Sequence, residues 1–593
     1  MGVPKFYSWL RQKNREYKGI LQYEVPSAVS SISIDMNGIL HDVAQLVFAY
    51  GKYPNAERLQ RLPTMSQDQL FADYFAALGT RLLTILTEVS PQDFLVLAVD
   101  GVAPVAKINQ QRARRFRADM SVSSPFFNSN VISPGTEFMF SVDEFLKVWL
   151  TENSASLPQN VIYSSHLVPG EGEHKIFDLY RSGVIPSFGS HCIYSLDADL
   201  VVLSLTLSRD ILIIREDLSN IINVTNFRQY ISGRLRSKTA IEDFIILSYF
   251  LGNDFLPAPP SLDDLPNAIE LLLDTYVKLN QPLIVGGKIS YDNLKAVLTQ
   301  LASGEEKLFA AELSRLRNPP VEMREATRVR NLVTREGTRT VTEFDLEKYR
   351  RSWYQSALGS RSLADVAAFL LEREAFPVTD NRVSQMADSY LAGLSWIWKY
   401  YTGRSLDLAW FYPYHYAPLL VDLARGTSNQ VRSTDPSPDP TSFTYLNVVQ
   451  QLTAILPASS AMLLPVEMRF LSSPQSPIFD EFPAVSIIEN KSEGAEWHST
   501  VLLPFFSEWR LLLATPSFTP ERAEMFAEKN EILIRKTGPI ATRSFRPPQP
   551  SLRGFSSRGR GFSRGSTPRG SSERGRGSSR GRGSSWKEKK PLM

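Results

Sequence analysis

Two pairs of carboxylates stand two residues apart in the sequence, in segments that could hold a cation. Asp197 and Asp199 follow an apolar run that starts at Cys192. Residues at i and i+2 of extended backbone lie on the same face, and two carboxylates placed this way repel each other unless a cation or proton lies between them. Glu171 and Glu173 repeat the spacing among glycines, which permit close approach of the backbone. The pairs therefore predict a shared cation or proton.

Three further acids stand at the ends of apolar segments. Asp35 ends a β-branched run that starts at Ser31, Asp100 ends the run that starts at Phe94, and Asp254 follows a helix-like apolar stretch. Such an acid, taken alone, is more often a turn or cap residue. However, buried strands that alternate with helical segments predict an α/β fold, with a largely parallel central sheet flanked by helices. Ligands of these sheets bind beyond the carboxyl ends of the strands, so we expect the acids to meet at one edge.

The seven acids together suggest a divalent cation site. Oxygen ligands without cysteine favour Mg²⁺ or Mn²⁺, and a single cysteine leaves no cysteine-based zinc site. Seven carboxylates exceed what one Mg²⁺ takes, so we expect two ions about 4 Å apart, with Mn²⁺ able to substitute. Such a pair hydrolyses phosphodiesters. A structural Ca²⁺ cluster and scattered turn acids remain alternatives. The predicted ligands are Asp35, Asp100, Glu171, Glu173, Asp197, Asp199 and Asp254.

A group of cationic and amide side chains follows Asp100. Its members stand at i, i+4, i+7 and i+8 of a predicted helix and share one face. A terminal phosphate is the natural ligand, because it carries more anionic oxygen than an internal diester and arginine binds it bidentately. The alternative is a solvated basic helix face. The four residues are Lys107, Gln111, Arg114 and Arg115.

The net charge of +3 averages two unlike parts of the chain. Residues 551–593 carry nine Arg, three Lys and two Glu, a net charge of +10, and every one of these arginines precedes a glycine. Residues 1–550 carry 53 basic and 60 acidic side chains, a net charge of −7. The tail has too few apolar residues to fold, and RG-rich segments bind RNA with little sequence preference. We expect a disordered tail that contacts RNA or protein; a merely solubilising tail is the alternative.

The composition bounds the domain organisation. We expect a catalytic α/β region over residues 1–260, a mostly helical region over 261–375, a second folded region over 376–545 that closes the site, and a tail over 546–593. No apolar run approaches the ~18 residues of a membrane span, and the start of the chain is unlike a secretory signal. With its single cysteine, the chain is expected inside the cell, in cytoplasm or nucleus, as a monomer.

The motifs together resemble a known family, the XRN/Rat family of 5′→3′ exoribonucleases. The second region carries two of them, Gly393-Leu-Ser-Trp396 and Tyr412-Pro-Tyr-His-Tyr-Ala-Pro418. Those of the first region are Met1-Gly-Val-Pro-Lys-Phe6, Asp35-Met-Asn-Gly-Ile-Leu-His41, Val99-Asp-Gly-Val-Ala-Pro104, Asn109-Gln-Gln-Arg112, Arg114-Arg-Phe-Arg117, Pro134-Gly-Thr-Glu-Phe-Met139, Pro169-Gly-Glu-Gly-Glu-His-Lys-Ile176, Leu196-Asp-Ala-Asp-Leu200 and Gly252-Asn-Asp-Phe255.

The resemblance implies a metal-dependent 5′-nuclease fold and a role for each candidate residue. The seven acids match the family's metal-binding set, and the four residues after Asp100 match its pocket for a 5′-monophosphate. His41 and Trp396 match two rings that hold the first bases. Without the family, His41 would be a cap or surface residue and Trp396 a core residue.

The implied activity is processive, Mg²⁺-dependent hydrolysis of single-stranded RNA with a 5′-monophosphate to 5′-mononucleotides, in RNA decay or processing. A flap-type structure-specific endonuclease and a non-catalytic RNA-binding scaffold are the alternatives.

Overall fold

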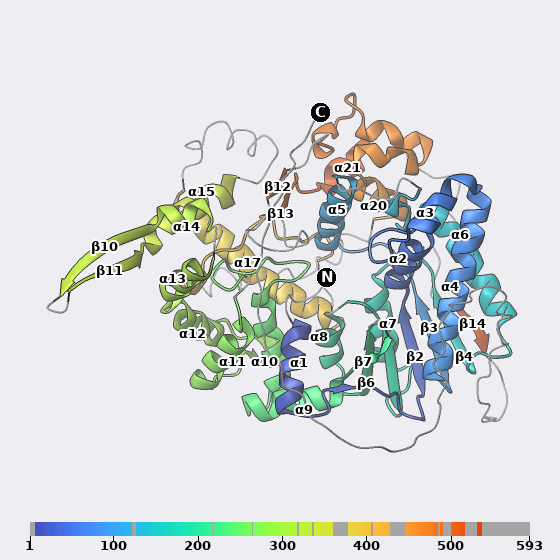
Figure 1. Ribbon diagram of the computed structural model, residues 1–593, viewed down its shortest axis with the longest axis horizontal. Coiled ribbons are helices and arrows are strands. Elements are labelled where there is room, and N and C mark those ends of the chain that lie inside the picture. Colours follow the sequence, from blue (N-terminus) through green and yellow to red (C-terminus); the bar gives the residue numbers. More distant parts are fainter. Residues whose placement is uncertain are drawn as a thin grey trace, which may run out of the picture. The chain divides into compact units, whose positions relative to one another are not determined.

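An eight-stranded sheet lies at the centre of the computed structural model (Figure 1). Five neighbouring strands, in the order β6-β5-β2-β3-β4, run parallel, which confirms the predicted largely parallel sheet. Antiparallel strands β7, β1 and β14 extend it at its edges. The strands are β1 (Leu21–Gln22), β2 (Ser31–Asp35), β3 (Phe94–Ala98), β4 (Asn160–Ser164), β5 (Ser190–Tyr194), β6 (Asp210–Arg215), β7 (Asp217–Asn223) and β14 (Glu531–Arg535).

The structure describes residues 6–535 with some gaps, and all of them belong to one compact unit that spans Met1–Pro547. The predicted tail over residues 546–593 lies outside the described residues. The gaps are residues 121–125, 198, 216, 264, 317–318, 335–336, 360–377, 405–406, 427–445, 484–486, 490–499 and 516–530.

Helices cover both faces of the sheet. Alternate strand residues point to opposite faces, so Ile32 and Leu95 face one core and Val96 and Ile193 face the other. The first core is closed by α2 (Met36–Val47), α4 (Gln67–Val89) and α6 (Glu137–Glu152). The second is closed by α7 (Gly172–Arg181), α8 (Asp199–Leu205), α9 (Val224–Leu235) and α10 (Ala240–Ser248).

The predicted helical region contains helices and one long hairpin. Strands β10 (Thr327–Thr334) and β11 (Gly337–Phe344) pair over eight positions and interrupt the helices of this mostly helical region. The hairpin extends away from the helices around it (Figure 1). Valine and threonine recur in both strands, and this β-branched content favours extended backbone over helix. The neighbouring helices are α11 (Ala268–Leu279), α12 (Tyr291–Ala302), α13 (Glu305–Arg315), α14 (Val321–Glu325) and α15 (Leu346–Gly359).

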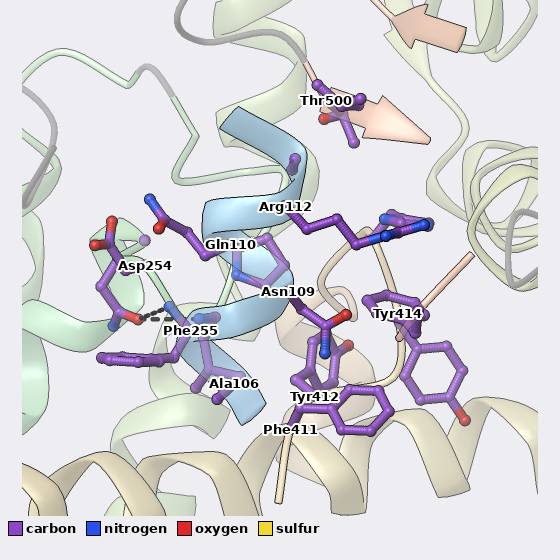
Figure 2. Close-up of a pocket in the computed structure, with 18 of the residues that line it drawn as sticks. Ala106, Asn109, Gln110, Arg112, Asp254, Phe255, Phe411, Tyr412, Tyr414 and Thr500 are labelled. Carbon is purple, nitrogen blue, oxygen red and sulfur yellow. Dashed lines mark hydrogen bonds between the residues drawn. The ribbon is translucent and has the colours of Figure 1, made fainter. Parts of the chain in front are cut away.

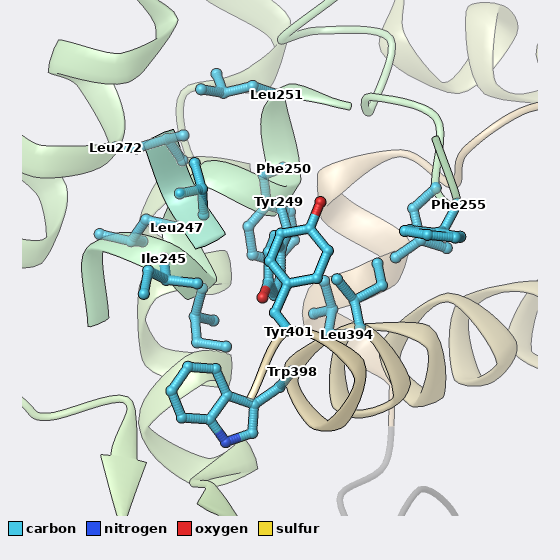
Figure 3. Packing of buried hydrophobic residues seen from close by; sticks show 14 of the residues in the cluster. Ile245, Leu247, Tyr249, Phe250, Leu251, Phe255, Leu272, Leu394, Trp398 and Tyr401 are labelled. Carbon is cyan, nitrogen blue, oxygen red and sulfur yellow. The ribbon is translucent and has the colours of Figure 1, made fainter. Parts of the chain in front are cut away.

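The long helix α17 (Asp380–Tyr401) connects the second region to the catalytic one. Its Leu394 and Tyr401 pack beside Tyr249 and Phe250 of the short helix η3 (Tyr249–Leu251), as Figure 3 shows. The next elements, α18 (Leu420–Arg425) and α20 (Val448–Ile455), lead to the short helices η4 (Ala458–Leu463), η5 (Val466–Ser472) and η6 (Phe479–Glu481). The hairpin β12 (Ile487–Glu489) and β13 (Thr500–Leu502) and helix α21 (Glu508–Ala514) complete the region.

Helix α4 is long and apolar enough, by length and composition alone, to cross a membrane. Its Tyr74, Leu78 and Leu82 are buried in the first core, together with residues of α2 and α6. This burial is typical of a core helix in an α/β fold.

Candidate active site

Two strand-end acids meet at the carboxyl edge of the sheet. Asp35 is the last residue of β2, and Asp100 lies two residues beyond the neighbouring strand β3. Oxygen atoms of these two acids and of Glu173 lie within 4.8 Å of one another. Asn37 donates from Nδ2 to Asp100 Oδ2 at 2.8 Å and accepts from the Asp100 backbone N–H at 3.1 Å. The strand ends and the first turn of α2 thus hold these carboxylates in place.

Gly172 sits between the acids, and its lack of a side chain is required. Its N–H donates to Asp100 Oδ1 at 2.7 Å. A Cβ at this position would lie 2.8 Å from Asp35 Oδ1 and 3.1 Å from the Ala98 carbonyl oxygen. A larger residue would therefore push the start of α7 away from the strand ends. The glycine permits the close approach of the backbone that the sequence predicted.

The remaining acids join the same group. Lys107 Nζ bridges Asp254, at 2.8 Å, and Glu171. The charges of Asp197 and Asp254 raise the pKa of Asp199, and the charge of Asp197 likewise raises that of Asp35, so these acids interact electrostatically. The structure therefore brings all seven predicted acids to one edge of the sheet, although they are spread over 220 residues of the chain.

Burial and mutual repulsion dominate the electrostatics. Burial and the charges of Asp100 and Asp197 raise the pKa of Asp35 well above its usual range. Burial and Glu171 do the same for Glu173, and burial with Asp197 raises the pKa of Asp199 to about 6. Two acids differ, although burial alone would raise their pKa: Lys107 lowers the pKa of Asp254, and Arg114 and Lys107 help to lower that of Asp197. Protons or cations would relieve this repulsion.

The residues present fit a divalent cation. Asp35 Oδ1 and Asp199 Oδ1 are buried and find no hydrogen-bond partner among the described residues. A buried oxygen without a partner is unfavourable, and a cation would satisfy it. Glu171, Glu173 and His174 form a second group of close ligand atoms. An all-carboxylate set around the first group suits a hard cation.

Helix α5 (Val105–Met120) carries the predicted phosphate residues beside the acids. Lys107 is buried, and the Gln111 Oε1 is buried without a hydrogen-bond partner among the described residues. Arg115 donates to Ser133 Oγ at 2.7 and 2.9 Å, so other protein groups already hold its guanidinium. Arg114 is exposed. The helix thus presents an exposed cation (Arg114), a half-buried one (Arg115) and a buried one (Lys107) next to the carboxylates.

The two predicted stacking rings differ in accessibility. His41 of α2 is half-buried, and desolvation together with the charges of Arg114 and Arg115 lowers its pKa to about 3. The ring is therefore neutral and lies close to the phosphate helix. Trp396 is 0% exposed and donates from Nε1 to the Asp407 carbonyl oxygen at 2.7 Å.

Other aromatic rings surround Trp396. The rings of Phe255, Tyr400 and Trp410 have centroids 5.1 to 5.2 Å from it. A base could stack on Trp396 only after some of these neighbours move. The stacking roles of Trp396 and His41 remain predictions.

Two family models together match most of the sequence up to residue 538. The model described as "XRN 5'-3' exonuclease N-terminus" matches residues 1–217, and that described as "Xrn1 helical domain" matches residues 235–357 and 372–538. The chain belongs to the XRN 5′-3′ exonuclease family.

Curated relatives support this assignment. 5'-3' exoribonuclease 1 of Homo sapiens is 26% identical over 87% of this chain and 34% of the relative. The Schizosaccharomyces pombe protein of the same name is 25% identical over 87% of this chain and 48% of the relative. The 5'-3' exoribonuclease 2 homolog of Drosophila melanogaster is 25% identical over 87% and 70%. The chain thus spans about a third to a half of the length of the first two.

One solved structure, the catalytic core of Rad2 in complex with a DNA substrate, is also similar. It is 14% identical, with a TM-score of 0.31, over 53% of this chain and 79% of that one.

Two further residues of this XRN family chain, which the sequence analysis did not identify, lie beside the acids. Tyr400 donates its hydroxyl to Glu171 Oε1 at 2.5 Å, and its ring stacks on His174 with centroids 3.8 Å apart. Lys175 donates to the carbonyl oxygens of Val99 and Ser165 at 2.7 and 2.9 Å. Tyr400 stands four residues after Trp396 on the same helix face, a spacing that could have suggested it.

Proposed function

We propose that this chain is a divalent-metal-dependent, processive 5′→3′ exoribonuclease that hydrolyses single-stranded RNA with a 5′-monophosphate to 5′-mononucleotides. The observation that carries the proposal is the convergence of seven carboxylates beside the basic face of α5. The names of the curated relatives support the reaction direction and the class of substrate.

The acids would hold two Mg²⁺ ions, for which Mn²⁺ can substitute. Such a pair supplies an activated water and stabilises the leaving 3′-oxygen of a phosphodiester. The protein's part is to fix the carboxylates through Asn37, Gly172 and the strand ends.

The α5 residues would hold the 5′-terminal phosphate. Arg114 is exposed and can donate to it. Gln111 would donate from its Nε2, because its buried Oε1 can only accept. Lys107 now pairs with Asp254 and Glu171, and cations bound to those acids would leave its ammonium for the phosphate. Each phosphate oxygen gains a charged or amide donor in this arrangement. Arg115 would act from its place beside Ser133.

Digestion of RNA labelled at its 5′ end tests this function. We expect 5′-monophosphorylated RNA to release mononucleotides from the outset with Mg²⁺ and none with EDTA. The same RNA with a 5′-triphosphate should be degraded much more slowly, because the proposed pocket would hold a single phosphate. Internal fragments from the start would favour the flap-type endonuclease instead, and tight RNA binding without any hydrolysis would favour the scaffold.

We further propose that the tail over residues 551–593 adds affinity for RNA through its net charge of +10. Deletion of the tail should weaken RNA binding and flatten its dependence on salt, while the rate of the chemical step stays nearly unchanged. An unchanged salt slope would assign the tail to a protein partner or to solubility.

A further inference from the structure

A cavity of about 320 Å³ lies on another side of α5, next to the candidate active site. Its walls are α5, the loop that follows η3, and two segments of the second region, residues 411–415 and 500–505. The first of these segments belongs to the motif Tyr412-Pro-Tyr-His-Tyr-Ala-Pro418, which the proposed reaction leaves without a role. The volume falls at the low end of the ~300–1,000 Å³ that small-molecule sites span.

Two amide side chains in this cavity have hydrogen-bonding groups to offer. Gln110 has both its Oε1 and its Nε2 buried, and neither finds a partner within the part of the chain that the structure describes. Figure 2 shows Gln110 extending from α5 toward the side of the cavity where Asp254 and Phe255 lie. Asn253 uses its Oδ1 to accept the N–H groups of Phe255 and Leu256, at 2.9 Å each, so that its buried Nδ2 remains unpaired among the described residues.

Such amides predict a ligand with a matching edge. A carboxamide presents one acceptor and one donor side by side, and leaving both buried and unpaired is unfavourable. The edge of a nucleobase offers the complementary donor and acceptor, and glutamine and asparagine pair with adenine in this bidentate way.

Aromatic rings form another wall. Phe505 stacks on His415 with centroids 4.4 Å apart and lies 5.5 Å from Phe411. Phe411 and Phe505 are only half-buried, and both line the cavity. Partly exposed rings beside unpaired amides are the combination that binds an unstacked base, because the rings supply a stacking surface and the amides read the edge.

The cavity also has cations for a phosphate. Arg114 and Arg117 of α5 line it, whereas Asp254 is neutralised by its ion pair with Lys107. Gln110 and Gln111 are consecutive, so their side chains leave the helix about 100° apart. Helix α5 therefore turns one face to the active site and the adjacent face to this cavity, and Arg114 borders both.

We propose that this cavity binds a nucleoside monophosphate unit, with its base between Gln110 and the Phe411–Phe505 wall and its phosphate toward Arg114 and Arg117. The unit is either a nucleotide of the RNA strand or a released mononucleotide, and in naming these sources the inference rests on the proposed function. Binding itself requires no hydrolysis, so it can be tested whether or not the chain cleaves RNA.

The experiment is titration calorimetry of the full chain in EDTA with adenosine 5′-monophosphate and with ribose 5-phosphate, which lacks the base. The variants are Gln110→Leu, whose wild-type side chain makes no hydrogen bond to the residues that the structure describes, and Phe505→Leu. Gln300→Leu, at an exposed position of α12, is the matched control. We expect each cavity variant to weaken the adenosine nucleotide about tenfold, with ribose 5-phosphate and the control unchanged.

A second arm separates the two sources of the ligand. Anisotropy of a labelled 5′-monophosphate RNA, again in EDTA, should weaken with Gln110→Leu if the cavity holds a nucleotide of the strand, and should stay constant if it holds a released mononucleotide. Unchanged affinity for both RNA and nucleotide in both variants would overturn the proposal. So would an equal loss for ribose 5-phosphate, because the effect would then lie at the phosphate and not at the base.

Discussion

The acids of the catalytic region and the aromatic residues of the second region reach the same site in different ways. Asp35 and Asp100 follow adjacent parallel strands, so the sheet brings them together. Trp396 and Tyr400 lie on α17, and Tyr400 reaches Glu171 across 229 residues of sequence. The comparison suggests that the sheet edge supplies the chemistry while the packing of α17 supports it. Substitutions at the sheet edge should therefore affect mainly hydrolysis, and substitutions in the second region mainly stability and the positioning of the acids.

The largest effect is expected at the sheet edge. Asp197→Ala removes one oxygen ligand from the proposed cation site, and we expect hydrolysis of 5′-monophosphate RNA to fall at least ~10³-fold, equivalent to ~4 kcal/mol of transition-state stabilisation. RNA affinity should hold, because the α5 residues are untouched. Single-turnover digestion and fluorescence anisotropy measure the two quantities.

A matched control for this variant is Glu306→Ala, because Glu306 is an exposed acid in the first turn of α13. It should leave both quantities unchanged. Turnover retained by Asp197→Ala would remove Asp197 from the catalytic set.

The sheet-edge acids could be predicted from the sequence because the rule that gathers them is local. Each follows a buried segment, and parallel strands end at one edge. The Lys107 to Arg115 face could be predicted from helical spacing alone. Local patterns could not predict which of these side chains pair with one another. Lys107 bridges two of the acids and Arg115 is held by Ser133, and these pairings depend on the distance between elements far apart in the chain.

The second region tests whether Trp396 stacks on bases or fills the core. Its side chain is completely buried, so Trp396→Ala should lower the free energy of unfolding by about 3–5 kcal/mol, as for other buried tryptophans. Thermal melting of the full chain measures this. A variant that melts like the wild type but binds RNA more weakly would instead support the stacking role that the family resemblance implies.

Sequence reasoning reached less of the second region because its contacts are long-range. Trp396 could be placed in an aromatic-rich helix, yet nothing near it indicates Phe255 and Trp410 as its neighbours. The pairing of β14 with β4 joins residues more than 350 positions apart. Likewise, the β10–β11 hairpin lies in a region expected to be mostly helical, although valine and threonine in its strands favour extended backbone.

Tyr400 links the two regions through the hydrogen bond from its hydroxyl to Glu171, and removal of that hydroxyl is a minimal way to break the link. Tyr400→Phe keeps the ring on His174 but removes the hydrogen bond to Glu171. Loss of a partner that orients a metal ligand typically weakens metal affinity ~10–100-fold. We therefore expect a higher Mg²⁺ concentration for half-maximal cleavage, with the rate at saturating Mg²⁺ nearly retained. A lower saturating rate at an unchanged Mg²⁺ requirement would contradict this positioning role.

Glu481 is a buried acid of the second region, and among the described residues it belongs to neither group of close metal-ligand atoms. Its side chain is 2% exposed, and burial raises its pKa to about 7, although Ser507, Arg112 and Arg510 oppose this shift. Because the folded chain binds this proton more tightly than the unfolded chain, with its pKa near ~4.3, the stability falls as pH rises from about 4 to 7.

Glu481→Gln removes that proton equilibrium, so the variant should lose less stability than the wild type between pH 5 and pH 8, by about 1–2 kcal/mol. Melting temperatures of both proteins at the two pH values, in EDTA, measure the difference. Magnesium should leave the difference unchanged, because Glu481 belongs to the packing of the second region and not to the sheet edge. Equal pH dependence in the two proteins would mean that Arg112 and Arg510 keep Glu481 ionised, and the second region would then hold its buried acid as an ion pair, as Lys107 holds Asp254.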